Sequence, residues 1–213
     1  DFPVSEYRRY YSNIVGKFGP QVQAALNKLS ALKISRICPL HGPVFRQDLD
    51  EILEKYRLWS AYEPEEKGVV IAYASVYGHT ANACFALADA LSERGVRDVR
   101  LFDVSKTDGS YILSEVFRRS HLVLASVTYA GGLFPAMESL ILELKNHGLK
   151  NRTVALMENG TWAPVSGKKM TELLTGAPVT LLGQKVTLLS AMKESHRPAL
   201  EALADALAAG IVG

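Results

Sequence analysis

Residues 68–81 read GVVIAYASVYGHTA and decide the fold. The first half, residues 68–74, is a short continuous apolar run rich in β-branched side chains, which is typical of a strand covered on both faces. The run at 80–94 then carries Ala83, Leu87, Ala90 and Leu91 at helical spacing and stops at Gly95. The sequence therefore predicts a buried strand, a turn and a helix. Such a turn directs backbone N–H groups and the positive end of a helix dipole at one spot.

The turn at residues 75–80 has the chemistry of a phosphate cradle. Ser75, Tyr77 and Thr80 supply hydroxyl groups, Gly78 is its glycine, and the turn contains neither lysine nor arginine. A nucleoside triphosphate site with magnesium would carry a Walker lysine here, and a dinucleotide site would carry three glycines. The turn therefore favours a phosphate monoester held by N–H and O–H donors alone. The alternative is an ordinary hydroxyl-rich turn between a strand and a helix.

Two further loops of this kind follow later strands. Residues 126–132 (SVTYAGG) follow a predicted strand at 121–126, and residues 158–164 (ENGTWAP) follow one at 152–158. Each loop combines glycine, polar donors and one aromatic residue, Tyr129 or Trp162, a combination that suits a planar heterocycle. Doubly wound sheets bind ligands at the carboxyl ends of their strands, so we expect the three loops to form one site. The alternatives are a hydrophobic plug for Trp162 and a solvent-tipped edge residue for Tyr129.

Strand and helix patterns alternate throughout the chain after residue 67, which predicts an α/β fold with a doubly wound parallel sheet. The predicted order is strand 68–74, helix 80–94, strand 98–104, helix 110–119, strand 121–126, helix 135–147, strand 152–158, helix 165–175, strand 178–190 and helix 194–209. Gly183-Gln184 interrupts the last strand. The charged segment 61–67, which contains Pro64, is the predicted linker to an amino-terminal part at residues 1–60.

From Lys67 to the end, the chain resembles the flavodoxin-like domain of flavodiiron proteins (the A-type flavoprotein family of nitric oxide and oxygen reductases), on residues 75–80, 126–132 and 158–162. The resemblance implies a five-stranded parallel sheet at 68–213 and flavin mononucleotide (FMN) as cofactor. It implies a phosphate cradle of Ser75, Val76, Tyr77, Gly78, His79 and Thr80, and ring contacts from Thr128, Tyr129, Ala130, Gly131, Gly132, Asn159, Gly160, Thr161 and Trp162. Val76 departs from the methionine or threonine common in related loops, which changes bulk near the phosphate but not its donors.

The first third resembles the carboxyl-terminal end of the metallo-β-lactamase-like domain that precedes the flavodoxin-like domain in that family. The residues that carry this resemblance are YYSNIVGKFG at 10–19 and CPLHGP at 38–43. The resemblance implies that His41 is the last ligand of a non-haem diiron site. His41 follows a short predicted strand at 34–38 and lies between Pro39 and Pro43, which stiffen the loop. We expect residues 1–60 to be a mostly helical remnant of that domain.

The remaining histidines argue against a diiron site within this chain. The family's His-x-Glu-x-Asp-His segment is absent from the sequence, and the other histidines, His79, His121, His147 and His196, show no ligand spacing. Two irons need several converging histidines and carboxylates. We therefore expect non-haem diiron only in a full-length protein, of which this chain is a piece.

Composition limits the classes of partner and compartment. The chain has 213 residues, is 48% hydrophobic and carries a formal net charge of +2, without a long basic run, so nucleic acid binding is not indicated. No apolar stretch is long enough to span a bilayer. The two cysteines, Cys38 and Cys84, are each expected in the core, and so few cysteines are typical of a reducing cytoplasm.

The function that the resemblance implies is electron transfer by FMN. A donor protein such as rubredoxin or a reductase would reduce the flavin, which would pass electrons to the diiron centre that reduces oxygen or nitric oxide. The family forms head-to-tail homodimers, in which one subunit's FMN lies beside the other's irons. We expect no catalytic acid or base in this chain, and we interpret Glu158 as a hydrogen-bonded organiser of its loop.

Two other functions are open from the sequence. The first is a flavodoxin-like NAD(P)H:quinone reductase, which requires a roomy pocket over the flavin ring. Trp162 covering a ring face would argue against this function, and so does the amino-terminal third, which such enzymes lack. The second is a non-enzymatic assembly module that binds no flavin.

Overall fold

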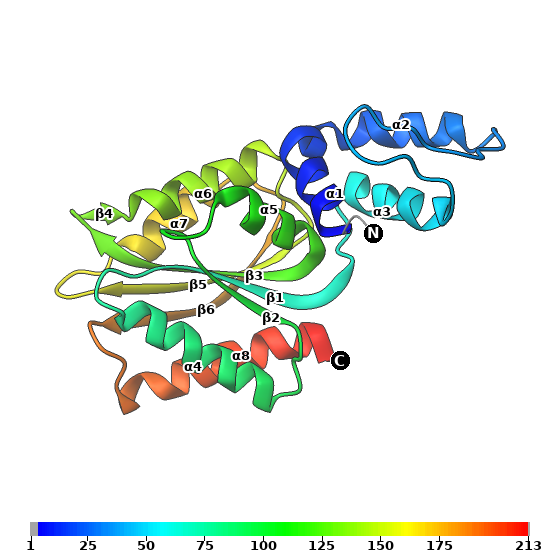
Figure 1. Ribbon diagram of the computed structural model, residues 1–213. Helices are drawn as coiled ribbons and strands as arrows, with labels where there is room; N and C mark the ends of the chain where they lie inside the picture. The colour runs from blue at the N-terminus through cyan, green and yellow to red at the C-terminus, as the bar shows by residue number, and fades with distance from the viewer. Residues whose placement is uncertain (1–3, 213) are drawn as a thin grey trace.

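The computed structural model describes residues 4–212 and contains one mainly parallel β-sheet. Its main strands are β1 (Glu66–Ala74), β2 (Val99–Asp103), β3 (Arg119–Tyr129), β5 (Thr153–Gly160) and β6 (Thr180–Leu189). They pair in parallel in the order β2-β1-β3-β5-β6 (Figure 1). A two-residue strand, β4 (Gly132–Leu133), pairs antiparallel with the end of β3. The predicted doubly wound sheet with five parallel strands is confirmed.

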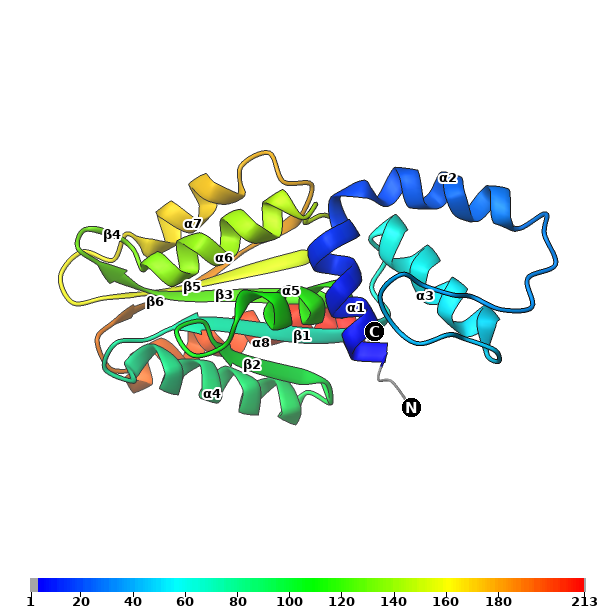
Figure 2. The same cartoon turned by 45° about the horizontal axis from the view of Figure 1, so that its top comes forward.

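Helices cover both faces of this sheet. Helices α4 (His79–Glu93) and α8 (Arg197–Val212) lie on one face, and α5 (Gly109–Arg118), α6 (Pro135–Asn146) and α7 (Ser166–Leu174) lie on the other (Figures 1 and 2). Successive side chains of a strand point to opposite faces, so Val69 and Ile71 pack with the first layer and Val70 with the second. This two-sided burial explains the unbroken apolar run in β1.

The predicted elements match the observed ones to within a few residues, with three informative differences. Strand β3 extends to Tyr129 and β5 to Gly160, so the first residues of the two predicted loops belong to strands. Strand β6 is continuous, although Gly183 and Gln184 lie where its register with β5 shifts. The last predicted helix begins as a single 3-10 turn at Glu194–His196 before α8.

The amino-terminal part is mostly helical, as predicted. It comprises α1 (Val4–Tyr10), the short π and 3-10 turns η1 (Tyr11–Val15) and η2 (Gly16–Phe18), α2 (Gly19–Leu29) and α3 (Leu49–Ala61). Helices α2 and α3 lie side by side at the amino-terminal end of the sheet, and α1 packs on α5 (Figure 2).

The prediction of a strand at residues 34–38 is wrong. Only Ile37 forms a bridge, with Phe45, through two backbone hydrogen bonds of 3.0 and 2.9 Å. Pro39 and Pro43 have no N–H group to extend that ladder, and the chain reverses between them. Cys38, expected in the core, is exposed in this irregular segment, whereas Cys84 is buried as a residue of α4. Burial raises the pKa of the Cys84 thiol.

A buried ionic cluster joins the amino-terminal part to the sheet. The Arg8 guanidinium lies 2.8 Å from the Glu65 carboxylate and 2.9 Å from that of Glu115. Lys55 and the Trp59 indole also donate to Glu65, each at 2.8 Å. Burial disfavours ionisation of Glu65, yet these donors hold its pKa below the usual value. Helix α1, α3 and the start of β1 are therefore connected through one carboxylate.

Arg152 makes a second connection in the same region. Its buried guanidinium donates to the carbonyls of Val116 and Phe117 at the end of α5 and of Tyr62 at the end of α3, at 2.6–2.9 Å. Burial lowers its pKa to about 10. The predicted division of the chain at 61–67 stays a prediction, and the outer ends of the two domains, residues 1 and 213, lie outside the described residues. Within residues 4–212, no helix has the length and apolar character needed to cross a membrane.

Candidate functional site

The three predicted loops come together at one edge of the sheet. Strands β1, β3 and β5 are neighbours, Ala74 pairs with Ser126, and Val127 pairs with Asn159, so the loops begin at the same level. From β1 the chain proceeds to β2 on one side of the sheet, and from β3 it proceeds to β5 and β6 on the other side. The strand order therefore reverses between β1 and β3, and this is the topological switch point. Ligands of doubly wound sheets bind at such an edge.

Within residues 4–212, the turn from β1 to α4 has hydrogen-bond donors for which no side chain acts as a cap. Gly78 has φ of +84° and precedes α4, whose amino terminus has no side-chain cap. The first N–H groups of a helix have no partner within the helix. A Cβ on Gly78 would meet no atom within 4 Å, so the glycine is needed for its backbone conformation and not for space.

Ser75 is the most informative residue of this turn. Its Oγ is buried and has no hydrogen-bond partner within the described protein. Leaving a buried hydroxyl unsatisfied costs about 1–3 kcal/mol. A bound acceptor would remove that cost. An anion at the start of α4 is such an acceptor and would also be favoured by the helix dipole.

The segment expected to follow β3 as a loop is a tight hairpin. Ala130 and Gly131 have φ of +48° and +72°, and Tyr129 pairs with Gly132 across them. Two central residues with positive φ are typical of the type I′ turn that joins twisted antiparallel strands. The Thr128 hydroxyl accepts from the Val165 N–H at 2.9 Å, which ties the hairpin to the start of α7.

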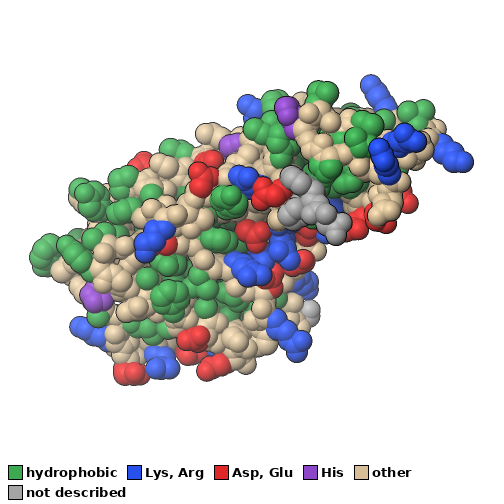
Figure 3. Space-filling model, in the orientation of Figure 1, with side chains coloured by type: hydrophobic (Ala, Val, Ile, Leu, Met, Phe, Trp, Pro, Cys, Tyr) green, Lys and Arg blue, Asp and Glu red, His purple; other side chains and the backbone are tan. Residues whose placement is uncertain are grey.

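The aromatic side chains of the site are exposed. Trp162 is 93% exposed and Tyr77 86% exposed, which rules out the hydrophobic plug considered for Trp162. Tyr129 is half exposed and packs edge-on against Phe134, with ring centroids 5.6 Å apart. Figure 3 shows hydrophobic side chains gathered at the end of the molecule where β3 and β5 terminate. These rings are free to lie against a planar ligand.

Asn159, expected beside the ring, is only 3% exposed and bonds to other loops. Its Nδ2 donates to Thr80 Oγ1 at 3.2 Å and to the Ser190 carbonyl at 3.0 Å, and its Oδ1 accepts from the Ser190 N–H at 3.1 Å. The turn after β6 therefore belongs to the same edge, which the sequence analysis missed. This could have been predicted from the sequence, because the last parallel strand must end at the same edge of the sheet as the others.

Glu158 organises its loop, as interpreted from the sequence. Its carboxylate accepts from the Thr187 hydroxyl at 2.8 Å and from the Gly167 N–H at 2.9 Å, and it lies 2.6 Å from the Lys185 ammonium. Burial alone would raise the pKa of Glu158, but Lys185, Thr187 and Gly167 together hold it below the usual value. Lys185 and Thr187 lie on β6 and were not singled out in the sequence.

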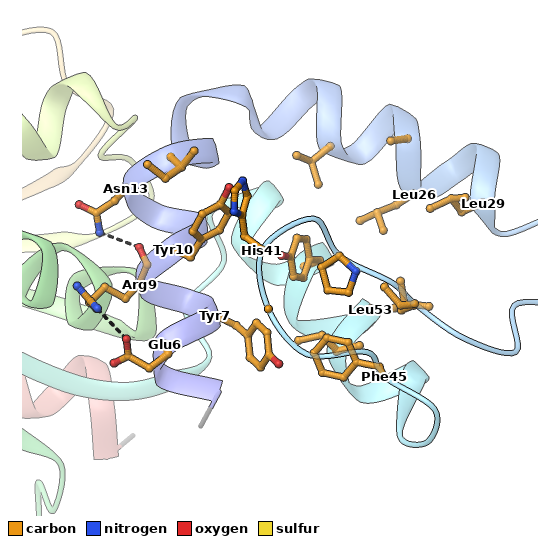
Figure 4. A pocket seen from close by; sticks show the side chains of 18 of the residues that line it. Glu6, Tyr7, Arg9, Tyr10, Asn13, Leu26, Leu29, His41, Phe45 and Leu53 are labelled. Atoms are coloured by element: carbon orange, nitrogen blue, oxygen red, sulfur yellow. Dashed lines mark hydrogen bonds and ion pairs between the residues drawn. The ribbon is translucent and has the colours of Figure 1, made fainter. Parts of the chain in front are cut away.

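The segment between α2 and α3 lies far from this edge (Figure 1), and it carries His41, which Figure 4 shows beside Tyr10 of α1. His41 is exposed, its ring centroid is 5.6 Å from that of Tyr10, and it borders a cavity of about 690 Å³ lined mainly by apolar side chains such as Leu26 and Phe45. Among residues 4–212, His, Cys, Asp and Glu side chains form no cluster of three that could hold a metal ion. The ligand role of His41 stays a prediction.

Comparison with known proteins gave no matching family model. An uncharacterized protein of Methanocaldococcus jannaschii is 24% identical over 88% of this chain and 47% of its own length. The nitric oxide reductase of Moorella thermoacetica is 27% identical over 85% of the chain and 45% of its own length. The anaerobic nitric oxide reductase flavorubredoxin of Aeromonas hydrophila is 26% identical over 75% of the chain and 32% of its own length. The chain thus spans a third to a half of these relatives.

Solved structures agree with these relatives. Rubredoxin oxygen:oxidoreductase of Desulfovibrio gigas superposes with a TM-score of 0.89 at 25% identity, over 98% of this chain and 54% of that one. The flavodiiron protein of Giardia intestinalis superposes with a TM-score of 0.87 at 20% identity, over 97% of this chain and 52% of that one. An archaeal flavodoxin, almost whole, matches 68% of this chain with a TM-score of 0.59. The resemblance to flavodiiron proteins is confirmed, and it supports a redox role as a flavoprotein.

Proposed function

We propose that this chain, which is similar to flavodiiron proteins over nearly its whole length, binds FMN at the carboxyl ends of β1, β3 and β5 and serves as an electron carrier. The observation that carries the proposal is the buried, unpartnered hydroxyl of Ser75 beside the uncapped amino terminus of α4. A phosphate monoester supplies the acceptor that this hydroxyl lacks. The loop supplies no lysine or arginine that a larger phosphate chain would require.

The residues of the edge have distinct roles in this proposal. The Ser75 and Thr80 hydroxyls and the first N–H groups of α4 hold the phosphate. Tyr129 and Trp162, both exposed, cover faces of the isoalloxazine ring. FMN supplies the redox chemistry when bound, while the protein sets its potentials through stacking and hydrogen bonding. Glu158 keeps the loop after β5 in place through β6 and α7.

The wider assembly is part of the same proposal. In a full-length protein, electrons come from a donor such as rubredoxin or a reductase and pass to a non-haem diiron centre, with His41 as one ligand. That protein is a cytoplasmic oxygen or nitric oxide reductase and a head-to-tail homodimer. The similarity to rubredoxin oxygen:oxidoreductase and flavorubredoxin supports this assignment.

The test is reconstitution of the purified chain with FMN, followed by an absorbance spectrum, identification of the heat-released flavin and an iron assay. We expect one FMN per chain, no stoichiometric iron, and reduction of the bound flavin by a reduced donor protein. Colourless protein that ignores added FMN would favour an assembly module. Rapid oxidation of NAD(P)H with a quinone would favour the quinone reductase instead.

A further inference from the structure

Asn159 occupies a position that a ring contact does not explain. Its amide is buried between Thr80 on one side and, on the other, Ser190, the first residue of the turn after β6 (the Ser190 turn). Thr80 is itself only 2% exposed and stands in the first turn of α4. The side chain therefore bridges the phosphate cradle to the segment after β6, and the hydrogen bonds of its amide go to Thr80 and Ser190.

The orientation of this amide follows from its partners. The Ser190 N–H is a donor, so the atom of Asn159 that faces it at 3.1 Å must be the acceptor, Oδ1. The NH₂ group then faces Thr80 and donates to Oγ1. A hydroxyl that accepts this bond keeps its own proton for donation. A phosphate oxygen is an acceptor, so Asn159 prepares Thr80 for the partner expected in the cradle.

The Ser190 turn provides a firm support for the amide. Ser190 has φ of +65°, in the left-handed region, and its N–H also donates to the Gly160 carbonyl at 3.1 Å. This holds the end of β6 against the end of β5. The amide is thus fixed at both ends before any ligand binds, which lowers the ordering cost of binding.

We propose that Asn159 is a positioning residue that orients the Thr80 hydroxyl toward the phosphate of FMN, with the Ser190 turn as its support. This inference rests on the proposed function, since it assigns a role within the same site. It also reassigns Asn159 from the ring, where the sequence placed it, to the phosphate.

The test measures dissociation constants for FMN and for riboflavin, which lacks the phosphate, by quenching of flavin fluorescence. The proteins are the wild type, Asn159→Ala, Thr80→Val and the double variant, with Asn27→Ala at an exposed site of α2 as a matched control. We expect Asn159→Ala to weaken FMN about tenfold and riboflavin less than about twofold. In the Thr80→Val background, Asn159→Ala should add less than about twofold, because its target is gone.

Asn159→Asp provides a second variant with nearly the same shape. Its carboxylate still accepts from the Ser190 N–H but accepts the Thr80 proton as well, and its charge repels the phosphate. We expect FMN to weaken more than in Asn159→Ala, with little change for riboflavin. If Asn159→Ala fails to fold, this variant carries the test. The ³¹P resonance of bound FMN should move in either variant while the visible spectrum of the flavin stays the same.

Equal weakening of FMN and riboflavin would overturn the inference, because it would mean that Asn159 supports the ring or the loop in general. Additive effects of Asn159→Ala and Thr80→Val would also overturn it. Both outcomes leave the proposed function standing, because FMN still binds the wild type. Failure of the wild type to bind FMN would instead overturn the proposed function.

Discussion

The two ends of the molecule differ in how much of a site they contain. At the carboxyl ends of the strands, three loops and the Ser190 turn supply donors, aromatic rings and a supporting network from this chain alone. At the other end, His41 borders an open apolar cavity of about 690 Å³ without a metal-binding cluster among the described residues. The first end therefore brings several candidate ligand-binding groups together, whereas the second surrounds a cavity mainly with apolar side chains beside one exposed histidine. The chain spans about half the length of the solved flavodiiron structures that it matches.

The largest expected effect concerns the proposed phosphate cradle. The double variant Ser75→Ala, Thr80→Val removes two hydrogen bonds to a charged phosphate, each worth about 1.5–3 kcal/mol, so FMN binding should weaken by about 3–6 kcal/mol. The measurement is a fluorescence titration with FMN, and Thr80→Ser, which keeps its hydroxyl, is the control. Unchanged FMN affinity in the double variant would remove the phosphate assignment.

The next effect tests whether the two ends form one folding unit. Arg8→Ala leaves the buried Glu65 carboxylate without its guanidinium partner, and breaking a buried pair in this way costs about 3–5 kcal/mol. We expect that loss in the free energy of unfolding by urea, in a single transition. Arg57→Ala, which breaks an exposed pair with Glu54, is the control and should cost less than about 1 kcal/mol. A separate early transition of the amino-terminal part would show that the cluster does not couple the two ends.

A smaller effect is expected on the free energy of unfolding when the pH is lowered. The pKa values of Glu65 and Glu158 are lowered in the folded state, so the unfolded chain takes up protons first as the pH falls. The stabilisation is fully present above the ordinary glutamate pKa of about 4.3 and is lost as the pH falls through the lower pKa values of the folded state. Urea unfolding at pH 7, 5, 4 and 3 should show this decline. Glu158→Gln should reduce the pH dependence; an identical profile in that variant would contradict the role of Glu158.

The smallest effect concerns the end of the molecule that carries His41. His41 is exposed, and the segment between α2 and α3 that carries it lies at the opposite end of the molecule from the start of α4 (Figure 1), so His41→Ala should change FMN affinity and stability by less than about 0.5 kcal/mol. Titration with FMN and urea unfolding measure both quantities. A clear loss of FMN affinity would mean that the two ends of this chain are coupled, contrary to the comparison above.

Local sequence patterns predicted most of the helices and strands, and they predicted that the three loops begin at the same edge of the sheet. The apolar run of β1, the helical spacing in α4 and the glycine that ends it are properties of neighbouring residues, and each predicted its element correctly. The strand expected at 34–38 failed because an apolar pattern does not reveal whether a partner strand lies alongside. Cys38 was misplaced for the same reason.

By itself, the amino-acid sequence determined the alternating strands and helices, the sheet class and the three polar loops, because hydrophobic periodicity and glycine placement act over a few residues. Only the tertiary structure decided which polar groups meet. Asn159 lies 79 residues from Thr80 and 31 from Ser190, and Arg8 lies 57 residues from Glu65. Those pairs depend on the register of β5 with β6 and on the packing of α1 against α5. A buried donor takes whichever acceptor the folded chain brings to about 3 Å, and no local pattern encodes that partner.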